Sequence, residues 1–328
     1  MNEKNRIRSF IKSYERELSV VLGIFLMGII FTVFNPIYVS FGNIKDIVDQ
    51  SSIYGVLALG MAFTIISGGI DLSAGAIVAL VGVISAKMLV AGINPWLCIF
   101  ASLIIGGAIG AVNGFLISKM HIQPFVATLA TMNVFRGIAY LITEGFPVSN
   151  LDPAFRNIAY GKLPLGIRAS ILIFIIGAIA THIILKYTRF GTYVYAIGGN
   201  REAARLAGVK CEKIEILAYT LGGICFGLGA VILNAKLGTA EATAANGYEL
   251  QAIAAVAIGG ASMAGGRGTI LGTFLGAILL TGLRVGLIVI GINPYWQYVA
   301  TGLVIVVAVY IEVVQSKIKG SRNTKKKE

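Results

Sequence analysis

Long apolar segments, separated by short polar ones, follow one another along almost the whole of this 328-residue chain. A helix needs about 20 mostly apolar residues to cross a bilayer, and ten segments meet that requirement. They cover residues 18–38, 50–69, 72–91, 96–117, 124–143, 169–187, 216–235, 249–264, 269–290 and 295–314. The eighth is short and rich in glycine, so we expect it to be broken or re-entrant. The pattern predicts an all-α, polytopic integral membrane protein in which residues 1–328 form a single transmembrane domain.

The composition excludes an ordinary soluble protein. Hydrophobic residues make up 56% of the chain and charged residues 13%, and the mean hydropathy is +0.83. A soluble chain of this length needs a more highly charged surface, so lipid must solvate most of this one. The first apolar segment is long, follows Arg16 and Glu17 and lacks a small-residue cleavage site. It is therefore interpreted as a span and not as a cleaved signal peptide.

The basic residues predict which segments face the cytoplasm. If both termini are cytoplasmic, the inner segments hold most of the 27 Lys and Arg residues, as the positive-inside rule requires. The cytoplasmic parts are then residues 1–17, the loop 188–213 and the basic tail 315–328. The net charge of +12 is explained by this topology and by attraction to anionic lipid heads. We expect no nucleic-acid partner, because a solvated tail accounts for the lysine run 325–327.

Two copies of one glycine-rich turn occur far apart in the chain. Residues 67–75 (SGGIDLSAG) and 264–272 (AGGRGTILG) each precede an apolar segment that ends in Gly-Ile-Asn-Pro, at 92–95 and 291–294. The match relates spans 2–4 to spans 8–10, and because the offset of six spans is even, it predicts a parallel internal repeat. Such repeats are typical of transporters, although glycine-rich turns also resemble one another by chance. The matching glycines include Gly68, Gly69, Gly265 and Gly266.

One acid lies beside the first of these turns. Asp71 follows the Gly68-Gly69 pair and precedes the third apolar segment. A carboxylate at this place can cap the following helix, and Ser73 can assist, because the first N–H groups of a helix need acceptors. The alternative role is ion coupling, which we regard as less favoured because ion-driven carriers usually bury more than one such acid.

The fifth span carries polar residues on one face. Asn133, Arg136 and Tyr140 recur at spacings of three and four, which places them above one another on a helix. An arginine within a span normally faces water or the protein interior, so these residues are candidates for lining a translocation path. Thr128 and Thr131 can add hydroxyl groups to it. Alternatively, Arg136 extends to the membrane surface or pairs with an acid there.

The loop 188–213 contains a short predicted helix. Asn200 is a good N-cap, an acid follows in the first turn, alanines propagate the helix, and Gly208 can end it in the left-handed conformation. Such a short helix needs a surface to stabilise it, which can belong to an ATPase partner or to the same chain. The residues of this candidate coupling helix are Asn200, Arg201, Glu202, Ala203, Ala204, Arg205, Leu206 and Gly208.

No pattern in the chain indicates catalysis. The three cysteines lie apart and two of them lie within apolar segments, and the two histidines have no neighbours at ligand spacing, so we expect no disulfide framework and no metal site. A G-x-x-x-x-G-K-[ST] sequence for nucleotide phosphates is absent, as are a Ser-His-Asp set and paired carboxylates. We therefore expect a protein that is not an enzyme and has no cofactor of its own.

Three motifs together resemble a known family of permeases. Glu202-Ala203-Ala204, three residues and Gly208 resemble the EAA-xxx-G coupling motif of permease subunits in binding-protein-dependent ABC importers. The segment 69–75 (GIDLSAG) resembles the hallmark of the simple-sugar, ribose-type branch, and 259–268 (GGASMAGGRG) resembles that branch's late glycine-rich segment. The resemblance extends from span 2 to the last span. One departure is that the Ile-x-Leu-Pro ending of many such loops does not follow Gly208.

The resemblance implies a multi-pass permease domain in the cell inner membrane that imports a simple sugar by alternating access. It implies four kinds of contact: a second permease copy or homologue, two ATP-binding subunits that bind the nucleotide, an extracytoplasmic sugar-binding protein and the lipid bilayer. An ion-coupled secondary carrier is the alternative, a membrane-embedded enzyme is disfavoured by the absence of a reactive cluster, and a branched-chain amino acid permease is disfavoured by the segment 69–75. The sequence leaves open which sugar is carried and whether the pair of permeases is a homodimer.

Overall fold

The computed structural model describes residues 15–161, 166–293, 295–304, 306–307 and 310, and in these residues the secondary structure is helical apart from one isolated bridge between Val148 and Ala240. The long helices are α2 (Glu15–Phe34), α3 (Phe41–Ile66), α4 (Ala74–Val90), α5 (Pro95–Ser118), α6 (Pro124–Thr143), α8 (Ala169–Tyr187), α11 (Cys211–Leu237) and α13 (Ile270–Val289). The shorter ones are η1 (Pro36–Val39), α7 (Pro153–Tyr160), α9 (Arg189–Gly199), α10 (Arg201–Leu206) and α12 (Tyr248–Ile258). The prediction of an all-α polytopic membrane protein is confirmed.

Seven helices of the described residues are long and apolar enough to cross a membrane: α2, α3, α5, α6, α8, α11 and α13. The predicted third span is the 17-residue helix α4, and the predicted eighth span is the 11-residue helix α12. The end of the predicted tenth span lies outside the described residues, although 296–304 are helical. The count of ten crossings therefore stays a prediction, and the short eighth helix agrees with the expectation of a broken span.

Helix α3 begins much earlier than its hydrophobic pattern predicts. Its first turns contain Lys45, Asp46 and Asp49, and because of these charges the predicted span began only at residue 50. In the structure Asp49 is buried and bonded to the side chains of Arg168, which directly precedes α8, and of Lys236 in α11. Tertiary partners therefore allow this polar stretch to remain helical at the end of the bundle.

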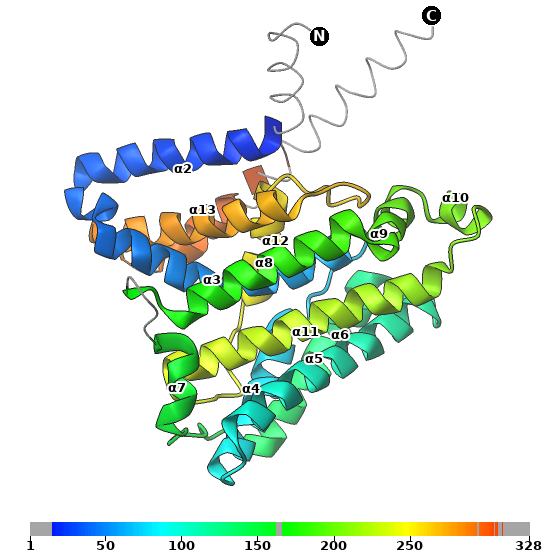
Figure 1. The fold of residues 1–328 in the computed structure, drawn as a ribbon, viewed down its shortest axis with the longest axis horizontal. Coiled ribbons are helices and arrows are strands. Elements are labelled where there is room, and N and C mark those ends of the chain that lie inside the picture. Colours follow the sequence, from blue (N-terminus) through cyan, green and yellow to red (C-terminus); the bar gives the residue numbers. More distant parts are fainter. Residues whose placement is uncertain (1–14, 162–165, 294, 305, 308–309, 311–328) are drawn as a thin grey trace, which may run out of the picture.

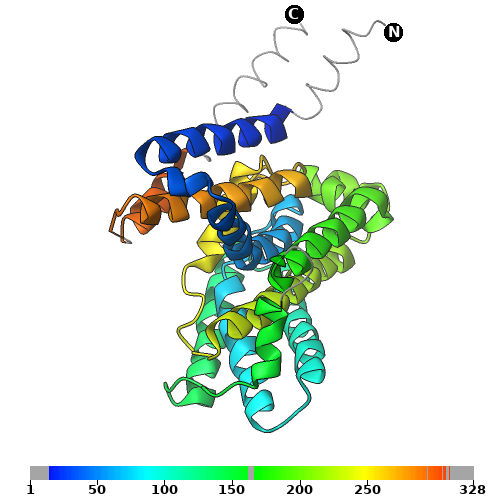
Figure 2. The same cartoon turned by 60° about the vertical axis from the view of Figure 1, so that its left-hand side comes forward.

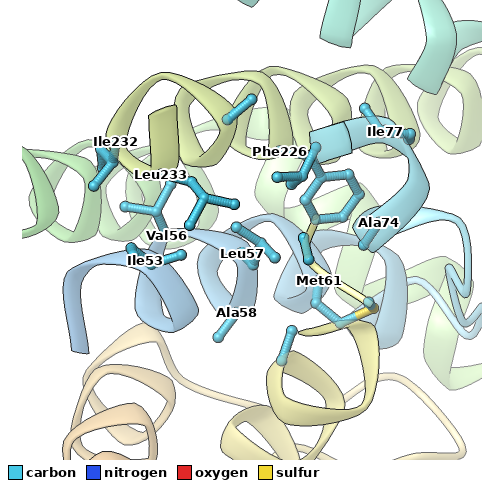
Figure 3. Close-up of a cluster of buried hydrophobic side chains, with 14 of the residues drawn as sticks. Ile53, Val56, Leu57, Ala58, Met61, Ala74, Ile77, Phe226, Ile232 and Leu233 are labelled. Atoms are coloured by element: carbon cyan, nitrogen blue, oxygen red, sulfur yellow. The ribbon is translucent and has the colours of Figure 1, made fainter. Parts of the chain in front are cut away.

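Helices α3, α4 and α11 form the centre of the bundle (Figure 1). Figure 3 shows Leu57 and Met61 of α3 near Leu233 and Phe226 of α11, with Ala74 of α4 beside Phe226. Helix α3 is buried along most of its length, whereas α2 lies at the periphery and exposes an apolar surface suited to lipid. The two central helices α3 and α11 lie close together where an added Cβ on Gly60 would lie 2.8 Å from the carbonyl oxygen of Gly222. Small residues allow this approach, as is common between helices in membranes.

The helices α3–α4–α5 form one unit and the helices α11–α12–α13 form a second. The corresponding helices of the two units run in opposite directions. Helix α3 ends where Ile66 accepts a hydrogen bond from Gly266, just before α13, so α3 and α13 run antiparallel. Helices α5 and α11 are also antiparallel, because Gly114 lies at the start of α11 and Gly106 lies near Gly227. Helix α3 in turn runs antiparallel to α11. Each unit therefore contains the same contacts in the same order, turned over in the membrane, which is the arrangement of an inverted repeat.

The expected parallel repeat between spans 2–4 and 8–10 stays a prediction beside this inverted relation. The two glycine-rich turns do lie at the same end of the bundle, and the helices that follow them, α4 and α13, do run in the same direction. The directions of these two helices agree with a parallel relation of the two turns. The inverted relation of α3 and α11 is a separate one and involves no matching sequence motif.

The two ends of the bundle carry different short helices. Helices α9 and α10 project at one end, beyond the ends of α8 and α11, and α7 covers the opposite end (Figures 1 and 2). At the end opposite α10, the segment 238–247 leads from α11 to α12 without helical structure. Helix α12 begins close to the start of α4, since an added Cβ on Gly75 would lie 2.4 Å from a carboxylate oxygen of Glu249. Two short helices thus start side by side inside the bundle.

Candidate functional site

The predicted short helix in the loop 188–213 is confirmed as α10. The side chain of Asn200 accepts a hydrogen bond from the backbone N–H of Ala203 at 2.9 Å, which is the expected N-cap, and Gly208 has a positive φ of 85°. Helix α9 precedes it and was not predicted separately. The two helices form a compact structure at the end of the bundle (Figure 1).

One face of α10 is held by the chain itself. Ala204 is buried and packs with Ile197 of α9 and Cys211 at the start of α11. Arg201 donates to the carboxylate of Glu215 in α11, with Nε 2.6 Å from Oε1. This hydrogen bond raises the pKa of the Arg201 guanidinium.

The other face of α10 is open. Leu206 is 84% exposed, and Glu202 and Arg205 form an exposed ion pair at 3.0 Å beside it. An exposed leucine flanked by charges on a short, anchored helix is suited to insertion into a groove of another protein. Ala203 is exposed on the same helix.

The two glycine-rich turns meet each other and the end of α9. Gly266 donates its backbone N–H to the carbonyl oxygen of Ile66 at 2.9 Å. An added Cβ on Gly265 would lie 2.8 Å from Cα of Gly68, and one on Gly198 would lie 1.9 Å from the carbonyl oxygen of Ile66. Backbone therefore contacts backbone at this junction, which only glycines permit. Residues that are far apart in the sequence thus form one joint beneath α10.

Asp71 lies in a buried polar group behind the first turn. Its Oδ1 accepts hydrogen bonds from the backbone N–H of Ser73 at 2.9 Å and from the Ser73 hydroxyl at 2.6 Å, and Asn113 of α5 donates to that hydroxyl at 2.7 Å. Ser73 makes no side-chain cap of its own. Asp71 is therefore bonded to the N-cap residue Ser73 itself and not, as expected, to the N–H groups of the first turn of α4, and Ser73 links Asp71 to α5.

Arg136 of α6 binds the chain segment that precedes α12. Its Nη1 donates to the carbonyl oxygens of Ala242 at 2.7 Å and Ala244 at 2.6 Å. The alternatives that the sequence left open were water, the protein interior, the membrane surface and an acid. The structure agrees with the protein interior, where the guanidinium satisfies carbonyl groups of the segment 238–247 that have no helix to bond to.

The other residues predicted on α6 divide between two environments. Thr128 is buried, and its hydroxyl lies 2.8 Å from the carbonyl oxygen of Pro124 and 3.2 Å from that of Ile70, beside the first turn. Thr131 is buried too and bonds within its own helix. Asn133 and Tyr140 are exposed on the surface of the single chain. The five residues therefore do not gather around one cavity.

A cavity of about 420 Å³ lies instead at the end of the bundle that carries α10. The ion pair of Arg201 and Glu215, the turn at Gly68 and Gly69 and the side chain of Tyr219 are parts of its lining. No group of three His, Cys, Asp or Glu side chains in the described part of the chain is placed to hold a metal ion.

Sequence reasoning missed several residues of this region. Asn113 and Tyr219 are polar residues within the apolar spans 4 and 7, Glu215 directly precedes span 7, and these positions were the only signal for them. Tyr219 is 1% exposed, and an added Cβ on Gly69 would lie 2.3 Å from its hydroxyl oxygen. Their importance depends on the meeting of α3, α5 and α11, which the sequence does not contain.

Comparison with known proteins finds membrane permeases of transport systems. The family model described as the permease component of branched-chain amino acid transport systems matches residues 43–309. The chain is 40% identical over 298 residues to the ribose import permease protein of Bacillus subtilis strain 168, covering 90% of this chain and 92% of that protein. It is 37% identical over 310 residues to the ribose import permease protein of Escherichia coli strain K12, covering 93% and 96%.

A third relative, the galactose/methyl galactoside import permease protein of Escherichia coli strain K12, is 36% identical over 316 residues, covering 91% of this chain and 94% of that protein. Comparison with the solved structures finds no match. The matched region begins within the first turns of α3 and includes both glycine-rich turns, α10 and the whole central core. The chain therefore belongs to this family of transport-system permease components.

Proposed function

We propose that this chain is the membrane-spanning subunit of an ATP-driven importer for a simple sugar, with a ribose-like monosaccharide as the cargo. The observation that carries the proposal is similarity over about nine tenths of the chain to proteins named as import permeases for ribose and for galactosides. The family description names branched-chain amino acids, but these relatives are named for sugars. Their names also favour an importer subunit over an ion-coupled carrier.

In this proposal α10 is the element that receives motion from an ATP-binding subunit. Its buried face is fixed to α11 by Arg201 and Ala204, whereas Leu206 and the pair Glu202–Arg205 are free to contact another protein. A helix anchored on one side and open on the other can transmit a force to the bundle. ATP binds to that partner and not to this chain, which has no phosphate-binding loop.

The remaining partners follow from the orientation that the basic residues favour. The end that carries α10 faces the cytoplasm together with both termini, and the end covered by α7 faces outward, where a sugar-binding protein would deliver the cargo. A second permease copy or homologue completes the transporter, with two ATP-binding subunits. The exposed residues Asn133 and Tyr140 of α6 are then candidates to face the second copy and the polar path between the two. Arg136 supports this path by holding the segment 238–247.

A reconstituted system tests the proposal. The chain is inserted into liposomes with its ATP-binding subunits and its sugar-binding protein, and uptake of radiolabelled D-ribose is measured with and without ATP. We expect uptake that requires ATP and all partners. Accumulation of ribose by the chain alone, driven by an ion gradient, would refute an ATP-driven importer, and transport of leucine but not of any sugar would refute the cargo class.

A double variant tests the role of α10. Glu202→Lys with Ala203→Asp changes the charge of the open face and leaves the Arg201–Glu215 pair in place. We expect loss of ATP-dependent uptake with normal amounts of folded protein in the membrane. The matched control is Glu202→Asp with Ala203→Ser, which preserves charge and size and should retain uptake. Equal uptake by both double variants would contradict the coupling role.

A further inference from the structure

The cavity beside α10 is formed by elements that meet only in the folded protein. Its walls come from the ends of α3, α5 and α9, the start of α6 and the first turns of α11. The volume of about 420 Å³ lies within the range of about 300–1,000 Å³ that is usual for small-molecule sites. It lies at the end of the bundle away from α7, which is the cytoplasmic end in the proposed orientation.

The charges of this cavity compensate each other. Arg201 and Glu215 are the lining residues with opposite charges, and they are bonded to each other through two nitrogen–oxygen contacts of 2.6 and 3.2 Å. A charged ligand would have to break this pair. A neutral ligand with several hydroxyl groups can instead accept from the guanidinium and donate to the carboxylate at the same time.

A second observation indicates unused hydrogen-bonding capacity at the wall. The Tyr219 hydroxyl is buried and has no hydrogen-bond partner among the described residues, although such a group normally has one. It lies directly behind Gly69, which lines the cavity and has no side chain to separate the two. Ile117 and Pro124 provide apolar wall beside these groups. Hydroxyl partners next to apolar carbon match the two kinds of surface on a monosaccharide.

The cavity is also connected to α10. Arg201 is the first residue of that helix, Glu215 belongs to α11, and Gly198 at the end of α9 lies against the glycine turns. A ligand that bridges Arg201, Glu215 and the turn at Gly69 would hold these elements at a fixed distance from one another. These elements, α10, the start of α11 and the first glycine-rich turn, must move relative to one another when an ATP-binding subunit pulls on α10. A bound ligand would therefore oppose that movement.

We propose that this cavity binds a neutral monosaccharide from the cytoplasmic side and that its occupation slows further import. The inference rests on the proposed function, because the sugar is the product of transport. It adds a second sugar site, which is separate from the path across the membrane and responds to the amount of sugar already inside the cell.

Binding is tested on the chain alone, in nanodiscs, where both ends are accessible. Equilibrium dialysis with radiolabelled D-ribose should give one saturable site, and unlabelled D-ribose 5-phosphate should compete at least tenfold less well because of the paired charges. Ala264→Phe places a large side chain at the exposed edge of the cavity, and Gln123→Ala removes a lining amide that makes no cap hydrogen bond. Both should weaken binding, whereas Ala91→Phe at the opposite end of α4 should not. The absence of saturable binding, or unchanged binding in Ala264→Phe, would overturn the proposal.

The effect on import is tested in the reconstituted system with D-ribose enclosed on the side of α10. When ribose is about ten times above its dissociation constant, an occupied form that does not turn over lowers the initial rate about tenfold. In Ala264→Phe, the ratio of the rates with and without enclosed ribose should return to about one. Uptake that is insensitive to enclosed ribose in the natural chain would contradict only the inhibitory site. Absence of uptake under all conditions would contradict the proposed function instead.

Discussion

Replacement of Asp49 gives a direct test of how the polar start of α3 is stabilised. The Asp49 side chain is 4% exposed and accepts from Arg168 at 2.5 Å, from Lys236 at 2.9 Å and from the Ser170 hydroxyl. Asp49→Asn removes the negative charge that these groups share. Arg168 retains a second partner, Asp46, at 3.1 Å, but the Lys236 side chain is only 11% exposed and, apart from the backbone carbonyl oxygen of Asp49, loses its ion-pair partner.

The expected cost follows from the unpaired lysine. Removing one partner of a buried ion pair usually destabilises a protein by about 3–5 kcal/mol, because the remaining charge is left without compensation. At about 2 °C per kcal/mol for a large domain, the unfolding temperature should fall by about 6–10 °C. Lys236→Met alone should cost less, since Asp49 keeps Arg168 and Ser170. The double variant Asp49→Asn with Lys236→Met should recover part of the loss.

The assay is thermal unfolding of the purified chain in nanodiscs, followed by tryptophan fluorescence, for the natural protein and the three variants. Recovery in the double variant identifies the uncompensated lysine as the cause. If the double variant unfolds at the same temperature as Asp49→Asn, or lower, then the cost arises from the lost bonds to Arg168 and Ser170 and the reasoning about Lys236 is refuted.

Three further predictions concern other parts of the bundle. Gly223→Leu should prevent close packing of α11 on α5, because even its Cβ would lie 2.1 Å from a carbonyl oxygen of α5. Size-exclusion chromatography should then show aggregated protein. The control Gly137→Leu, where an added Cβ meets no atom within 4 Å, should remain monodisperse. Arg136→Met removes two charge-assisted bonds worth about 1.5–3 kcal/mol each, so proteolysis of the segment 238–247 should become faster, and unchanged proteolysis would contradict this anchoring role. Asn200→Ala should destabilise α10 by about 1 kcal/mol and increase hydrogen exchange in its first turn, with exchange in α13 as the unaffected control.

The membrane class and most helices could be predicted because hydrophobic length is a local property of the sequence. The short helix α10 could be predicted for the same reason, since Asn200 and Gly208 act on their immediate neighbours. The early start of α3 could not, because Asp49 is compatible with a buried helix only when Arg168 and Lys236 arrive from other parts of the chain.

The site was predicted less completely than the fold. Asp71, Ser73 and the glycines were recognised as turn residues, and the structure places them at turns and at the start of α4. The inverted relation of α3 and α11 was missed because helix packing leaves no repeated motif in the sequence. The ion pair of Arg201 and Glu215 was missed because its two residues lie on different helices. Contacts of this kind depend on the crossing of elements and not on spacing along the chain.

The glycine joint between Gly198, Gly68 and Gly265 has a mechanical consequence. Where side chains separate two elements, rotamer changes absorb a small displacement, but here main-chain atoms touch directly and nothing between them can yield. A shift of α9 must therefore displace both turns together. Coupling between two sites is reciprocal, so rearrangement of the turns during passage of cargo must shift α9 by the same contacts. Movements of the turns inside the membrane would thus be transmitted to the exposed surface of α10 through the same contacts that transmit movements of α10 to the turns.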